Sequence, residues 1–173
     1  MESINLITGK EVAEIPVDFK KALIMTGETN SKFNIKETVP FFMVSDIEAS
    51  LRFYVTGLGF EIKNKWTPLD KIEWCALQRD TATLMLQELR KDVHHAGMPE
   101  GKPGIGVSIV FICEDALAIY EEVTAKGIKT SLPFVGNNMW VVSLKDPDGY
   151  RIDFESFTDV PEGTEYDETF KKV

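Results

Sequence analysis

The stretch VSDIEASLRFYVTGLGFEI, residues 44–62, carries the clearest structural signals in the chain. Ser45 or Asp46 can cap a helix, and the apolar residues that follow recur at helical spacing. Two glycines near its end stop the helix and lead into a strand over residues 59–66. Residues 38–44 precede the cap and are β-branched and aromatic. They therefore predict a strand, and the proline within them suggests the edge of a sheet.

The order of elements around this stretch occurs a second time along the chain. The first copy continues with two strand-like segments, residues 71–78 and 81–89. The second copy has the same composition pattern, and the segment DPDG is a strong turn signal before its last strand. Two copies of one unit predict two pseudo-symmetric sheets, each with a helix against it. The elements of the second copy are a strand over 105–113, a helix over 116–127 and strands over 128–136, 138–146 and 150–157.

We therefore expect an α+β fold built from two βαβββ modules. The first module covers residues 37–90 and the second covers residues 104–157, within one domain of residues 37–158. A Gly- and Pro-rich linker joins the modules and contains both histidines, His94 and His95. The remaining segments are an N-terminal arm, residues 1–36, and an acidic C-terminal tail, residues 159–173.

The composition excludes several classes of protein. The chain has 19 basic and 28 acidic residues, a net charge of −9, which disfavours binding to nucleic acid. No apolar run is long enough to span a membrane, and the N-terminus does not resemble a secretory signal. Cys75 and Cys113 lie in apolar strand-like runs, as reduced buried thiols do. We expect a cytoplasmic protein.

Three motifs together resemble the glyoxalase / bleomycin-resistance / extradiol-dioxygenase superfamily, which has the vicinal oxygen chelate fold. They are the helix motif at 44–62 with the later strand ATLMLQE, the second helix motif CEDALAIYEEVTAKGI and the closing segment DPDGYRIDFES. The resemblance implies that the modules curl into a half-open barrel-like sheet. It also implies a homodimer with a cavity at or near the subunit interface.

The resemblance further implies where a metal would bind in metal-using members. The corresponding four positions hold Val39, Met85, Ser108 and Asp153 in this chain. Valine cannot ligate a metal, a thioether is a weak ligand for zinc, nickel or iron(II), and a neutral serine is a poor one. We therefore expect no metal and no cofactor. The resemblance is closest to metal-free members related to bleomycin-resistance proteins, which implies antibiotic resistance by drug binding.

The expected cavity is mostly apolar with a few polar groups, as is usual for small-molecule pockets. Arg151 and Asp153 share one strand face, so they could pair, or Asp153 could be the counter-ion of a cationic ligand. Tryptophan faces can hold planar or cationic ligands, although each tryptophan could equally fill a core or an interface. The candidate ligand-binding residues are Phe41, Trp66, Trp74, Met85, Gln87, Ser108, Trp140, Arg151 and Asp153.

These observations favour a metal-free small-molecule-binding protein that sequesters a planar or cationic, antibiotic-like ligand in a dimeric cavity. The alternative is a metal-dependent glyoxalase-type lyase or isomerase, or a dioxygenase. A metal-free enzyme that uses Asp153 or Glu155 as general base also stays open, as does a non-catalytic module that binds a partner. Whether any reaction is catalysed is therefore undecided by the sequence.

Overall fold

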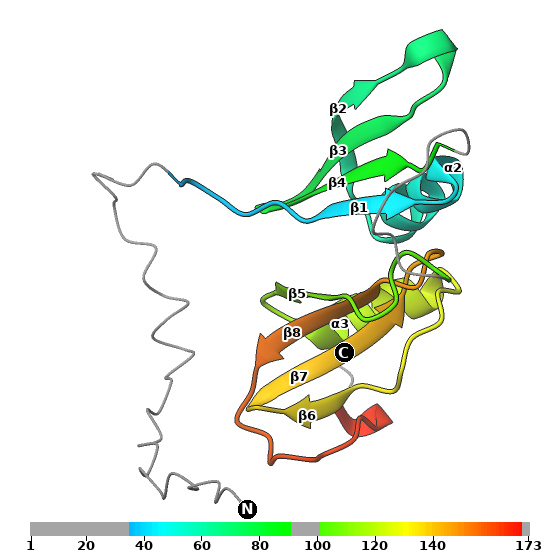
Figure 1. The fold of residues 1–173 in the computed structure, drawn as a ribbon. Coiled ribbons are helices and arrows are strands. Elements are labelled where there is room, and N and C mark those ends of the chain that lie inside the picture. Colours follow the sequence, from blue (N-terminus) through cyan, green and yellow to red (C-terminus); the bar gives the residue numbers. More distant parts are fainter. Residues whose placement is uncertain (1–34, 91–100, 171–173) are drawn as a thin grey trace, which may run out of the picture. The chain divides into compact units, whose positions relative to one another are not determined.

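In the computed structural model, residues 35–90 and 101–170 are described, and they form the two expected modules (Figure 1). The expected arm lies outside the described residues up to position 34, as do His94 and His95. The first module is a four-stranded sheet of order β1-β4-β3-β2, and the second is a four-stranded sheet of order β5-β8-β7-β6. In each sheet one pair is parallel and the other pairs are antiparallel. The predicted α+β fold is confirmed.

The strands are shorter than the sequence segments that predicted them. Strand β1 is an edge strand, as the proline before it suggested. The bounds in the first sheet are β1 (Phe41–Val44), β2 (Glu61–Trp66), β3 (Trp74–Arg79) and β4 (Ala82–Glu88). The bounds in the second sheet are β5 (Ser108–Ile112), β6 (Phe134–Gly136), β7 (Met139–Lys145) and β8 (Arg151–Phe157).

An aspartate caps each helix. The Asp46 side chain accepts hydrogen bonds from two backbone N–H groups at the start of α2 (Ile47–Leu51), and Asp115 does the same for one N–H of α3 (Ala116–Ala125). The first helix differs from the prediction because it continues as a π-helical segment, η1 (Arg52–Gly57). The amide of Leu58 bonds to the carbonyl five residues earlier, 2.9 Å away, which widens the last turn.

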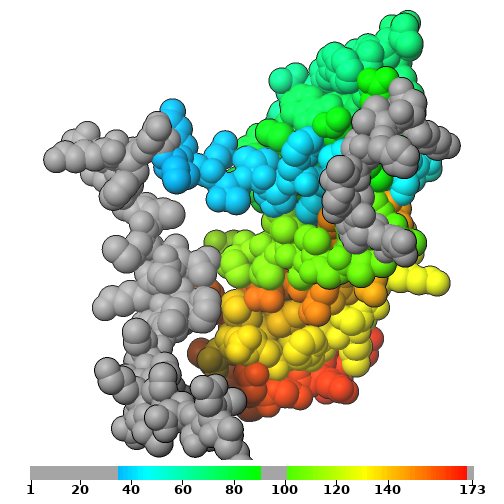
Figure 2. Space-filling view, in the orientation of Figure 1, coloured from blue at the N-terminus to red at the C-terminus, as the bar shows by residue number. Residues whose placement is uncertain are grey.

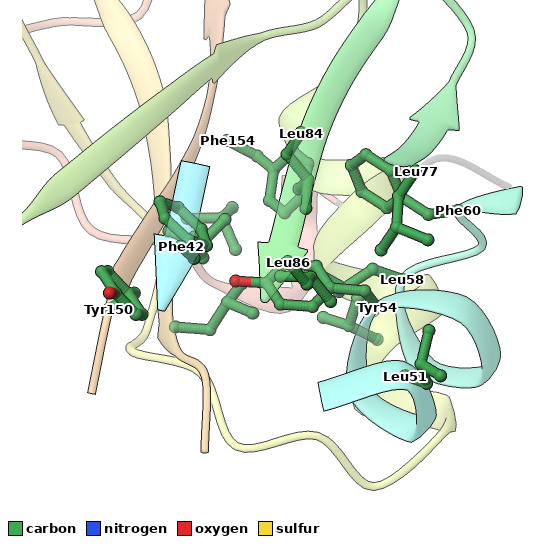
Figure 3. Packing of buried hydrophobic residues seen from close by; sticks show 14 of the residues in the cluster. Phe42, Leu51, Tyr54, Leu58, Phe60, Leu77, Leu84, Leu86, Tyr150 and Phe154 are labelled. Carbon is green, nitrogen blue, oxygen red and sulfur yellow. The ribbon is translucent and has the colours of Figure 1, made fainter. Parts of the chain in front are cut away.

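The core lies on the helix-facing side of each sheet. In β1 and β4 alternate residues are buried there, among them Phe42, Leu84 and Leu86. Figure 3 shows these side chains packed with Tyr54 and Phe60 from the region of the first helix. In Figure 2 side chains fill the gaps that the ribbon view leaves between strands. Burial of this one face leaves the opposite face of each sheet free for other contacts.

Aromatic contacts join the cores of the two modules. Phe42 stacks on Tyr150 with ring centroids 4.1 Å apart, and Phe60 contacts Phe111 at 5.8 Å. Such pairs add to the energy of apolar burial. The two modules therefore share one hydrophobic cluster.

The C-terminal acidic segment packs against the second sheet. The amide of Val135 in β6 donates to the carbonyl of Thr164 at 2.8 Å. A short 3-10 turn, η3 (Glu168–Phe170), then brings the Phe170 ring to 5.0 Å from Trp140. Up to Phe170, the segment expected as a tail is thus part of the folded domain.

Candidate functional site

The open face of the first sheet is the face turned away from the buried Phe42, Leu84 and Leu86. Strand register places Trp66 opposite Trp74, Trp74 opposite Gln87, and Met85 opposite Phe41. Residues directly opposite each other in neighbouring strands share a face. All five candidate residues of the first module therefore lie together on this face: Phe41, Trp66, Trp74, Met85 and Gln87.

Large apolar groups on this face are exposed. Phe41 keeps 51% of its surface exposed and Trp66 keeps 52%, whereas Phe42, the neighbour of Phe41 on the other face, keeps 2%. Exposed aromatic side chains grouped on one face mark a binding surface more often than isolated ones do. The first sheet thus offers a broad aromatic surface that also carries polar groups, among them the Gln87 amide.

The open face of the second sheet carries the other three candidates of this kind, Ser108, Arg151 and Asp153. Asp153 keeps only 4% of its surface exposed. Its carboxylate accepts hydrogen bonds from Ser108 Oγ at 3.0 Å, from Ser143 Oγ at 2.5 Å and from Arg151 Nε at 2.9 Å. The Arg151 side chain is half exposed. Asp153 is therefore paired with Arg151, which was one of the two alternatives that the sequence left open.

Glu155 follows Asp153 on the same face. Burial raises the pKa of the Glu155 carboxyl, and the nearby charge of Asp153 raises it further, while Arg151 opposes the shift. Two carboxyls on one face thus have different environments, because Asp153 has three donors and Glu155 is affected mainly by desolvation.

Trp140, unlike the other eight candidates, lies on neither open face. It pairs with Ser156 and Val135, and it is 5% exposed on the helix-facing side of the second sheet. There its ring contacts Phe170. The sequence could not show this, because the residues that cover Trp140 come about 30 positions later.

The four positions that the family uses for metal ligands do not form a metal site. Met85 lies on the open face of the first sheet beside Phe41. The Ser108 hydroxyl donates its proton to Asp153, so it does not offer a lone pair on the side of that carboxylate. Val39 carries no donor atom. Within residues 35–90 and 101–170, no group of at least three His, Cys, Asp or Glu side chains could hold a metal ion. The side chains at these four positions therefore do not supply the donors that such a metal site needs.

The thiols have no activating environment. Cys75 is buried and Cys113 is partly buried, and both are free. Burial raises the pKa of each thiol to about 11, which keeps the reactive thiolate scarce at neutral pH.

A cationic pocket at the edge of the second sheet was not predicted from the sequence. The pocket lies where the chain enters β5 and where β7 leads into β8, and it includes Lys102, Lys145 and Arg151. Lys102 and Lys145 are 43 positions apart, so no local motif joins them. The sequence signal for a pocket at these positions was weak, because each is a single lysine beside a glycine-containing turn.

These features match a known family. The chain belongs to the Glyoxalase/Bleomycin resistance protein/Dioxygenase superfamily, whose family model matches residues 35–154. A search among curated proteins gave no match. In the described part of the chain, no helix combines the length and the apolar character that crossing a membrane requires.

Solved structures share the fold at low sequence identity. The antibiotic binding protein TnmS3 from Streptomyces sp. CB03234 is 22% identical, with a TM-score of 0.56 over 73% of this chain and 99% of its own. TioX from Micromonospora sp. ML1 is 16% identical, with a TM-score of 0.57 over 70% of this chain and 98% of its own. Lactoylglutathione lyase from Agrobacterium tumefaciens is 15% identical, with a TM-score of 0.54 over 72% of this chain and 96% of its own.

Proposed function

We propose that this protein is a metal-free small-molecule-binding protein whose ligand is planar and largely apolar. The observation that carries this proposal is the grouping of five candidate residues on the open face of the first sheet, with Trp66 directly opposite Trp74. Aromatic rings prefer offset or edge contacts with other rings, so such a surface favours a planar ligand. Sequestration of an antibiotic-like molecule is one form of this function, and the fold shared with TnmS3 supports it.

Two findings separate this proposal from a metal-dependent lyase. The donor set at the family's metal positions includes a valine and a methionine, which leaves Asp153 as the one strong oxygen donor. That carboxylate is already engaged by three donors of the same sheet. The same engagement argues against Asp153 as the counter-ion of a cationic ligand, so a planar ligand is favoured over a cationic one.

The proposal includes a homodimer in the cytoplasm. Apolar residues on both open faces are exposed in the single chain, among them Val110 at 47% and Ile112 at 41%. A second copy would cover them and close a cavity over the ligand surface. The two free cysteines are consistent with a reducing compartment.

Titration with N-phenyl-1-naphthylamine (NPN), a neutral aromatic probe whose fluorescence rises in apolar sites, tests the proposal. We expect saturable binding, and we expect Trp66→Ala to weaken it about two- to tenfold, the value of one aromatic contact. Trp140→Phe is the matched control, because Trp140 lies on the other side of its sheet, and it should leave the affinity unchanged. Absence of saturable binding, or equal affinity in Trp66→Ala, would contradict the proposal.

Elemental analysis by inductively coupled plasma mass spectrometry tests the metal-free state. After dialysis against zinc, nickel, manganese and iron(II), we expect retained metal near zero. About one tightly held metal ion per chain would instead support the metalloenzyme.

A further inference from the structure

The beginning of β5 and the turn between β7 and β8 lie at the same end of the second sheet (Figure 1). Residues from both segments line the cationic pocket. Its volume is about 490 Å³, within the usual range for small-molecule sites. Ser108 and Arg151 line it and also belong to the open face of the second sheet. The pocket therefore adjoins the open face of the second sheet.

Two lysines in this pocket have no acidic partner among the described residues. The ammonium group of Lys102 donates to the carbonyl oxygen of Pro147 at 3.1 Å, a neutral acceptor. Lys145 is exposed, and within the described segments it has neither an ion pair nor a side-chain hydrogen bond. Each therefore keeps a charge that a ligand can use.

The nearby carboxylates are occupied by other donors. Asp146 Oδ1 accepts from the amides of Asp148 and Tyr150, both at 2.9 Å, and its Oδ2 accepts from the Tyr54 hydroxyl at 3.0 Å. Asp148 is buried and accepts from the amide and the hydroxyl of Ser45. The donors to both carboxylates are neutral groups, and among the described residues neither carboxylate forms an ion pair with Lys102 or Lys145.

The wall beside these lysines is made of tightly packed backbone and apolar side chains. A Cβ atom at Gly104 would lie 2.0 Å from the amide nitrogen of Tyr150, so the loop can approach the turn only with glycine there. Ile105 and Val107 follow and are exposed at 61% and 39%. Apolar surface next to these two ammonium groups is suited to a molecule with an apolar body and an acidic group.

We propose that this pocket binds the acidic group of an aromatic small molecule, with Lys102 and Lys145 as the recognising cations. The acidic group is a carboxylate, sulfonate or phosphate, because each offers oxygen acceptors to two ammonium groups. The proposal rests on the proposed function, since the aromatic body of the same ligand lies on the open faces.

Two probes that differ in one acidic group test this. NPN and 8-anilinonaphthalene-1-sulfonate (ANS) share the anilinonaphthalene body, and ANS alone carries a sulfonate. At constant ionic strength we expect the full-length protein to bind ANS at least about tenfold more tightly than NPN. Lys145→Gln should weaken ANS about fivefold, and the double variant K102Q/K145Q should reduce ANS affinity to that of NPN.

NPN affinity should be the same in these variants and in the wild type. Lys129→Gln, at an exposed lysine outside the pocket, is the matched control and should not change ANS binding. Equal affinity of the wild type for ANS and NPN would overturn this inference while leaving the proposed function in place, and so would a loss of ANS binding in Lys129→Gln as large as in Lys145→Gln. Absence of binding by both probes would overturn the proposed function and this inference together.

Discussion

Asp153 is the centre of a side-chain hydrogen-bond network in the second sheet. Its nearly buried carboxylate accepts from two hydroxyls and one guanidinium, all carried by β5, β7 and β8. A buried carboxylate is stable only when donors of this kind replace the lost water. The residue that occupies a metal-ligand position in the family is thus part of a structural polar network here.

Replacement of Asp153 tests that role. We expect Asp153→Ala to lower the free energy of unfolding by about 2–3 kcal/mol, because it leaves two hydroxyls and a half-exposed guanidinium without their acceptor. Urea denaturation of the wild type and the variant measures this. Asp159→Ala, at an exposed carboxylate six residues later, is the control and should change stability little. An Asp153→Ala protein as stable as the wild type would show that the network contributes nothing to folding.

At the scale of elements, the turn between β7 and β8 holds the two modules together. Its Asp146 accepts from the Tyr54 hydroxyl, its Asp148 accepts from Ser45, and the Tyr150 hydroxyl donates to the carbonyl of Met43 at 3.0 Å. The turn therefore bonds to residues about 90 to 110 positions earlier. A segment that the sequence indicates only as a tight turn forms the polar part of the contact between modules.

Gly104 offers a test of how closely the loop before β5 must approach this turn. A Cβ at that position meets backbone atoms of Gly149 and Tyr150 at 2.5 Å and less, and backbone cannot move aside as a side chain can. We expect Gly104→Ala to cost about 2–3 kcal/mol in urea denaturation. Gly57→Ala is the comparison, because its Cβ would meet the flexible end of Ile128 at 2.7 Å. A smaller loss at Gly104 than at Gly57 would contradict the close backbone approach.

At the scale of the whole molecule, both sheets bury the face that packs on the helix and leave the other face only partly covered. The exposed faces carry large apolar residues, such as Phe41, Val110 and Ile112. Monomers seldom expose grouped apolar surface of this kind. We therefore expect the protein to be a dimer in solution, with these faces turned toward the partner copy.

A charge on one of these faces tests the dimer. In sedimentation velocity we expect the wild type to sediment at twice the chain mass, and Val110→Asp to weaken association at least about tenfold, because a carboxylate would be buried without a partner. Leu69→Asp is the control, because Leu69 is 99% exposed in the 3-10 turn η2 (Pro68–Asp70), outside the strands that form the open faces. Its positive φ of 53° is also tolerated by aspartate. A monomeric wild type, or equal effects of the two variants, would contradict this arrangement.

Local signals in the sequence determined the order of elements, the cap of the first helix to within two residues, and the alternation of faces along the strands. Those features depend on short-range physics: a capping side chain acts within three residues, and side chains alternate along a strand. Alternation along the last strand therefore placed Arg151 and Asp153 on one face, whereas strand pairing in the structure groups Trp66 and Trp74 with Phe41, Met85 and Gln87.

Tertiary structure decided the rest. Trp140 lies away from the other candidates because Phe170, from a later segment, covers it. Asp153 pairs with hydroxyls of neighbouring strands, and Lys102 meets Lys145 in one pocket, because strand pairing and a glycine-dependent loop bring distant positions together. Contacts between residues tens of positions apart leave no periodic trace in a sequence, so only the folded chain could show them.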